Sequence, residues 1–109
     1  MLNEIFEIYS RQGESLIGIG IREAALPVPT AIDILNLFIN ERILVLGGDI
    51  YIKKDNYFYQ TYDNWYYEGS NLFNSINKAM HYLSQIKLEN AYVSFVLKLS
   101  NKGSTRIGL

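Results

Sequence analysis

The stretch 46–67 constrains the fold most, because its pattern is typical of a β-hairpin. Ile50 and Ile52 alternate with polar residues before the Asp55-Asn56 pair, and an aromatic-rich run follows that pair. Alternation on both sides of an Asp-Asn turn favours paired antiparallel strands. A two-residue turn predicts four facing pairs: Lys54 with Tyr57, Ile52 with Tyr59, Tyr51 with Gln60, and Asp49 with Tyr62. Asp49 and residues 62–65 should then meet at one end of the hairpin, whereas a three-residue loop would move side chains to the other face.

Length and composition are those of one ordinary domain, residues 1–109, with 49% hydrophobic residues. The absence of cysteine excludes disulfides, thiolate metal sites and thiol nucleophiles. Ten basic residues are scattered among eleven acidic ones, so nucleic acid is not an expected ligand. The first residues lack signal-peptide features, and no apolar run is long enough for a bilayer. We therefore expect a mature protein that is the whole chain and lies in the cytoplasm, without a membrane partner.

Apolar spacing predicts three helices. The first covers residues 3–12 and stops at Gly13. The second covers residues 31–41, with Thr30 as its start signal. The third is capped by Ser70, runs to about Ile86, and carries an apolar face made of Leu72, Phe73, Ile76, Ala79, Met80 and Leu83.

Strand signals complete the fold. The continuous apolar run 43–46 suits a central strand, and alternation from Val93 to Leu99 predicts a last strand. Residues 14–29 contain glycines and prolines and are predicted to connect elements across the core. The tail from Asn101 is predicted to fray. The predicted class is α+β, with three helices packed on a mostly antiparallel sheet of three or four strands.

Two motifs carry little chemistry. Gly18-Ile19-Gly20 resembles the start of a dinucleotide fingerprint, but it lacks the strand and helix that frame such a loop, which favours a flexible turn. His81 is the only histidine, and helical projection places it on the polar side of its helix. A solvated surface histidine is therefore favoured over a general base.

Acidic residues gather on the hairpin or just past it, namely Asp49, Asp63 and Glu68. Paired carboxylates could bind Mg²⁺ or perform acid and base chemistry. Aspartates beside glycine or asparagine are also ordinary turn formers. Structural turn roles are favoured, with partner recognition next and a metal site last, because no metal-ligand spacing is present.

Aromatic residues crowd the same region, and nine tyrosines occur in the chain. We favour a core position for Trp65. Alternation allows only part of the cluster formed with Tyr62, Tyr66 and Tyr67 to face inward. The remainder would form an aromatic patch beside acidic side chains, which is the usual composition of a protein-binding hot spot.

These motifs together resemble a known family. The run Gly20-Ile21-Arg22-Glu23, then 46–51 with its Gly-Gly-Asp sequence, then 62–66 with Asp-Asn-Trp-Tyr, is similar to the immunity protein 40 family of bacterial polymorphic-toxin systems. The likeness covers roughly residues 20–82. It implies a small cytoplasmic α+β protein that needs no cofactor, has no enzymatic activity and protects bacterial cells by binding a cognate toxin domain.

A toxin-binding site can be proposed from this resemblance and the aromatic, acidic cluster. Its expected residues are Tyr62, Asp63, Trp65 and Tyr66, with Asp49 and Glu68 in support. No catalytic or metal-binding residue is assigned. Two alternatives stay open: a small divalent-metal-dependent enzyme or ligand-binding domain using Asp49, Asp63 and Glu68, and a structural homodimer in which the last strand or a hairpin edge pairs with its copy. The chain could be a monomer or a homodimer.

Overall fold

Helical spacing of apolar side chains produces three α-helices in residues 2–99 and 103–108, which the computed structural model describes. The helices are α1 (Leu2–Gln12), α2 (Val28–Asn40) and α3 (Leu72–Ser84), and a short 3-10 helix, η1 (Ile17–Ile19), lies between α1 and α2. Each α-helix buries one side, with Tyr9 of α1 and Phe38 of α2 among the most enclosed side chains. The prediction of three helices is confirmed.

An antiparallel sheet of six strands forms within the same described residues. The strands are β1 (Glu14–Ser15), β2 (Ala24–Pro27), β3 (Leu44–Lys54), β4 (Tyr57–Tyr66), β5 (Ala91–Lys98) and β6 (Ser104–Thr105). Their order is β1-β2-β5-β3-β4, and β6 also pairs with β5. The predicted α+β class is confirmed. The strand count exceeds the predicted three or four because β1, β2 and β6 are short and lack a long alternating pattern.

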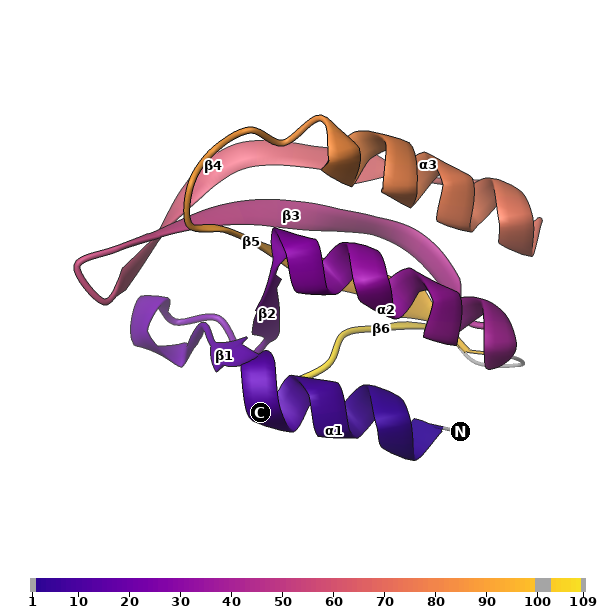
Figure 1. The fold of residues 1–109 in the computed structure, drawn as a ribbon, viewed down its shortest axis with the longest axis horizontal. Coiled ribbons are helices and arrows are strands. Elements are labelled where there is room, and N and C mark those ends of the chain that lie inside the picture. Colours follow the sequence, from indigo (N-terminus) through magenta and orange to yellow (C-terminus); the bar gives the residue numbers. More distant parts are fainter. Residues whose placement is uncertain (1, 100–102, 109) are drawn as a thin grey trace.

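Helices cover one face of the sheet, which we call the inner face. Figure 1 shows α2 and α3 in front of the strands, with α1 beside α2. The main hydrophobic core lies in this layer, where Phe38 of α2 meets Phe95 of β5 edge-on at a centroid separation of 5.5 Å. Ser75 of α3 ties the layers together, because its hydroxyl donates to Val45 O at 2.8 Å and accepts from Val45 N at 2.7 Å.

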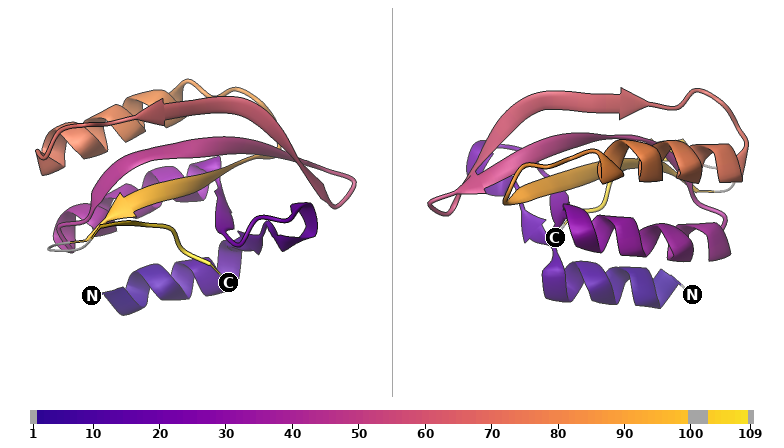
Figure 2. Two further views of the ribbon diagram at one scale, coloured as in Figure 1. Left: turned by 180° about the vertical axis from the view of Figure 1, so that it is seen from behind. Right: turned by 45° about the horizontal axis from the view of Figure 1, so that its top comes forward.

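The opposite, outer face is covered only in part. Figure 2, left, shows β4, β3 and β5 from this side, with the segment that contains η1 lying toward the hairpin turn. Under that segment a second, smaller apolar cluster forms from Leu16, Ala25 and Tyr51. The other end of the outer face carries no helix in the part of the chain that the structure describes.

The hairpin turn forms as predicted. Asp55 and Asn56 both have positive φ values, 53° and 69°, as a two-residue turn that matches strand twist requires. Three of the four predicted pairs are present: Lys54 with Tyr57, Ile52 with Tyr59, and Tyr51 with Gln60.

The fourth predicted pair is wrong. Asp49 faces Asn64 instead of Tyr62. Residues 61–63 of β4 all lie opposite the single residue Ile50, and this β-bulge shifts every later pair by two residues.

Two boundaries before β3 also differ from the predictions. The stretch 14–29 contributes β2 to the sheet, where Leu26 pairs with Val93 of β5. Helix α2 begins at Val28, and Pro29 fits its first turn because no intrahelical N–H is needed there. Thr30 does not cap this helix, since its hydroxyl donates to Gln12 Oε1 at 2.6 Å and ties α2 to α1.

The later elements bring further corrections. Asn71 rather than Ser70 caps α3, because its side chain accepts from Asn74 N at 2.9 Å. The helix ends at Ser84, and Phe73, predicted on the apolar face, is 62% exposed. The tail predicted to fray forms β6 over Ser104–Thr105, although Asn101 itself lies outside the described residues.

Within residues 2–99 and 103–108, no helix is both long enough and apolar enough to cross a membrane.

Candidate functional site

The bulge, residues 61–63 of β4, displays a tyrosine in an unusual conformation. Tyr62 has a φ of 65° and a relative exposure of 83%. Left-handed backbone is uncommon for a bulky residue, so the surroundings must hold it. Thr61 does so: its Oγ1 donates to Ile50 O at 2.8 Å and accepts from Asp63 N at 3.1 Å. A side-chain hydroxyl thus replaces part of the missing strand ladder.

A hollow of about 190 Å³ opens beside the bulge. Its walls come from both strands of the hairpin and comprise Asp49, Ile50, Tyr51, Gln60, Tyr62, Asp63 and Asn64. Three of the sequence-predicted site residues, Asp49, Tyr62 and Asp63, therefore meet around one hollow, although the register that brings them there is not the predicted one.

An ion-pair network holds Asp49 on the outer face. Arg106 Nη1 lies 3.0 Å from Asp49 Oδ2 and 2.7 Å from Glu23 Oε1. The Ser94 hydroxyl also donates to Glu23 Oε1 at 2.7 Å. Burial raises the pKa of the neighbouring Tyr51, and the charges of Asp49 and Glu23 raise it further. Asp49 is thus already partnered inside the protein.

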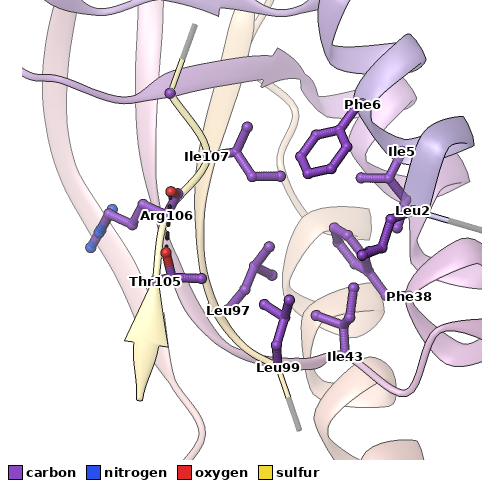
Figure 3. A pocket seen from close by; sticks show the side chains of 11 residues that line it. Leu2, Ile5, Phe6, Phe38, Ile43, Leu97, Leu99, Thr105, Arg106 and Ile107 are labelled. Carbon is purple, nitrogen blue, oxygen red and sulfur yellow. Dashed lines mark hydrogen bonds between the residues drawn. The ribbon is translucent and has the colours of Figure 1, made fainter. Parts of the chain in front are cut away.

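Sequence reasoning missed both partners of this network. Glu23 stands in the Gly-Ile-Arg-Glu run, which indicates no ion pair for it, and Arg106 lies in the tail for which the sequence predicts fraying. Figure 3 shows the Arg106 side chain pointing away from the apolar pocket that the tail forms with α1 and α2. No local pattern around Arg106 predicts this direction, because its partners lie far away in the sequence.

Trp65 lies in the core, as favoured from the sequence, with 5% exposure. Its ring stacks on Tyr82 of α3 at a centroid separation of 4.8 Å and meets Phe95 edge-on at 6.1 Å. A Cβ added to Gly48 would lie 2.6 Å from the indole, so a glycine is needed opposite the ring. Trp65 Nε1 is buried and has no hydrogen-bond partner among the described residues.

The remaining predicted residues are exposed at the sheet edge. Tyr66 is 70% exposed and stands opposite Gly47, while Glu68 lies just beyond β4. Asp63 is exposed, and its charge adds to burial in raising the pKa of Tyr82. We call the four exposed side chains Tyr62, Asp63, Tyr66 and Glu68 the edge patch.

The structure also places the residues considered for a metal site, a general base and a phosphate-binding loop. Within residues 2–99 and 103–108, no group of three or more His, Asp or Glu side chains is placed to hold a metal ion, so Asp49, Asp63 and Glu68 do not form one. His81 is on the surface of α3, as predicted, with its Nε2 3.2 Å from Gln85 Nε2. Gly20, at φ 83°, ends η1 in a turn.

These observations define a small α+β protein that presents tyrosine and carboxylate side chains along the free edge of its sheet. A family model described as Immunity protein 40 matches residues 15–97. The chain therefore belongs to the Immunity protein 40 family, which confirms the resemblance found in the sequence. The match includes the edge patch, whereas α1 and Arg106 lie outside it. Comparisons with curated proteins and with solved structures found no match.

Proposed function

We propose that this protein binds a cognate toxin domain of a polymorphic-toxin system in the bacterial cytoplasm and neutralises it, without enzymatic activity or a cofactor of its own. Membership in the Immunity protein 40 family supports a protein partner in general. The edge patch is the proposed contact surface, because it combines exposed aromatic and acidic side chains.

The conformation of Tyr62 is the observation that carries this proposal. A bulky residue at φ 65° with 83% exposure costs conformational free energy and contributes little to the core. Strain of this kind persists where the surrounding structure enforces it, and it concentrates at functional sites. Thr61 enforces it here through its contact with Ile50 O.

Each side chain of the edge patch has a chemical role in such a complex. Tyr62 and Tyr66 would bury large ring surfaces while their hydroxyls keep hydrogen-bond partners. Asp63 and Glu68 would pair with lysine or arginine side chains of the toxin and orient the encounter. Asp49 would support the patch from the wall of the hollow, where its carboxylate pairs with Arg106. Trp65 would act from behind, by holding β4 against the core.

Rescue by co-expression tests the proposal. The neighbouring toxin domain is expressed in a sensitive cell with wild-type protein, Tyr62→Ala or Asp63→Ala. Tyr57→Ala is the matched control, because Tyr57 is a 64% exposed tyrosine on the same strand outside the edge patch. Folding of each variant is checked by circular dichroism.

The expected result is rescue by the wild type and by Tyr57→Ala. Hot-spot truncations cost about 2 kcal/mol or more, so Tyr62→Ala and Asp63→Ala should weaken toxin binding roughly 30-fold and lose rescue. If both folded variants rescue as well as the wild type, the edge patch is not the interface. A wild-type protein that neither rescues nor binds the toxin would contradict the proposed function itself.

A further inference from the structure

We propose that the turn-side half of β4, residues 57–60, pairs antiparallel with the same segment of a second copy of this chain, so that one sheet continues across a two-fold axis. This inference goes beyond toxin binding and does not depend on it. It rests on the backbone, composition and shape of the free sheet edge.

Within residues 2–99 and 103–108, no strand pairs with the outer side of this segment's backbone. Strand β4 stands at the end of the strand order, with β3 as its neighbour in the described sheet. Lys53 N donates to Asn90 O, on the β5 side of β3. Neighbouring residues of a strand point their backbone groups in opposite directions, so Ile52 directs its groups at its partner Tyr59 on β4. By the same alternation, Phe58 and Gln60 direct theirs away from β3.

The composition of this edge favours strand addition. Residues 57–62 contain no charged residue, no proline and no glycine, and Tyr57 and Tyr59 are 64% and 54% exposed. Edge strands are ordinarily protected from pairing by charges, prolines or bulges. Lys54 and Asp55 precede the segment and Asp63 follows it, so the segment itself is unprotected.

The segment suits its own copy as the occupant. Antiparallel pairing centred on Tyr59 places Phe58 of each copy opposite Gln60 of the other, and these are the residues whose backbone groups point outward. Two tyrosine rings then face each other at the axis, and Tyr57 lies opposite Thr61 at either end. No charged residue lies within these paired residues, 57–61. Figure 1 shows the hairpin turn extending beyond the ends of α2 and α3.

The bulge limits this pairing to half of the strand. At Tyr62 the backbone turns to φ 65°, so a straight partner strand cannot continue past Thr61. In Figure 2, right, β4 forms the upper margin of the sheet along its whole length. The edge patch consequently stays outside the proposed dimer contact, and one edge strand carries two separate surfaces.

Size-exclusion chromatography with light scattering over a dilution series tests the proposal on the full chain. The mass of the wild type should rise with concentration from the 12.5 kDa of one chain toward twice that value. Tyr59→Lys places two like charges face to face and should hold the mass at one chain. Tyr66→Lys is the matched control: it makes the same substitution on β4 beyond the bulge and should dimerise like the wild type.

A backbone variant and hydrogen exchange locate the contact. Gln60→Pro removes an outward N–H while leaving the β3–β4 ladder intact, and it should abolish the dimer. Exchange at the Phe58 and Gln60 amides should slow as wild-type concentration rises. A wild type that stays a single chain throughout the micromolar to millimolar range overturns the proposal. So does a dimer that survives Tyr59→Lys, or protection of these amides that appears only when toxin is added.

Discussion

The two halves of β4 differ although they belong to one strand at one sheet edge. The turn-side half, residues 57–60, pairs residue for residue with β3, as the turn alone predicts. The base-side half, residues 61–66, is bulged, displays Tyr62 and buries Trp65. A turn therefore dictates the register of a hairpin only as far as its residues pair one to one.

Packing at the base of the hairpin accounts for the difference. Extended without a bulge, the predicted register would place Trp65 opposite Leu46. The two extra residues of the bulge move Trp65 opposite Gly48, where no side chain obstructs the indole. A shift by two residues also keeps every side chain on its original face. The bulge therefore lets a large ring reach the core and displays Tyr62 at the same time.

The largest expected effect separates the two neighbouring aromatic residues of the base-side half. Trp65→Ala removes a buried ring and should lower the free energy of unfolding by about 4 kcal/mol. Tyr66→Ala changes a side chain that is 70% exposed and should stay within about 0.5 kcal/mol of the wild type. Chemical denaturation measures both. Similar losses for the two variants would contradict the assignment of Trp65 to the core and Tyr66 to the surface.

A somewhat smaller effect is expected at the glycine that faces Tyr66. Gly47 has a φ of 156°, and an added Cβ would collide with the backbone oxygen of Trp65. Gly47→Ala should destabilise the protein by about 3 kcal/mol, because a carbonyl in a strand cannot rotate away. Gly18→Ala is the matched control, since a Cβ there meets no atom within 4 Å. Thermal and urea unfolding measure the stability of both variants. Equal stabilities for Gly47→Ala and Gly18→Ala would show that the base of the hairpin is loosely packed.

The hydroxyl that organises the bulge should contribute less. Thr61→Val removes the bonds to Ile50 O and Asp63 N and should cost about 1 kcal/mol. It should also speed amide exchange within residues 61–63 more than within residues 57–60. Thr30→Val, the same substitution at a hydroxyl bonded to Gln12, should cost no more than about 0.5 kcal/mol. Uniform exchange rates along β4 in Thr61→Val would show that the hydroxyl does not hold the bulge.

The smallest effect concerns pH and the polar contacts near the turn-side half. Glu14 accepts from Lys53 Nζ at 2.6 Å and from the Tyr92 hydroxyl at 2.7 Å. Burial raises the pKa of Glu14, but these two hydrogen bonds outweigh it and bring the pKa below the usual 4.5. Burial, reinforced by Glu14, raises the pKa of Tyr92 from 10.0 to about 12.

A pKa that differs between the folded and unfolded states makes the free energy of unfolding depend on pH. A lowered carboxyl pKa gives stability that is present above pH 4.5 and disappears as the pH falls through the folded-state value. A raised tyrosine pKa gives stability that is present below pH 10 and disappears as the pH rises toward 12. Melting temperatures measured across both ranges should therefore fall less steeply in Glu14→Gln than in the wild type. Glu7→Gln, on the exposed side of α1, should keep the wild-type profile, and a Glu14→Gln profile identical to the wild type would refute the role of these contacts.

Much of this molecule was predictable because it depends on residues that are close in sequence. Apolar spacing located the three helices, Asp55-Asn56 set the turn and its first three pairs, and the Gly-Gly-Asp and Asp-Asn-Trp-Tyr runs pointed to the family. Helical periods, turn conformations and alternation all arise within a few residues of backbone. The sequence by itself therefore determined the three helices, the long strands of the sheet, the fold class and the family.

Only the tertiary structure decided how the candidate site is arranged. Arg106 donates a hydrogen bond to Glu23, which lies 83 residues away in the sequence. Trp65 lies opposite Gly48, where its ring packs against Tyr82 and Phe95. Such contacts depend on which segments the folded core brings together, and no local period encodes them. The bulge has one local sign, which is the turn-forming pair Asp63-Asn64 within a predicted strand. This pair alone does not predict a bulge, because the bulge depends on how the ring of Trp65 packs in the core.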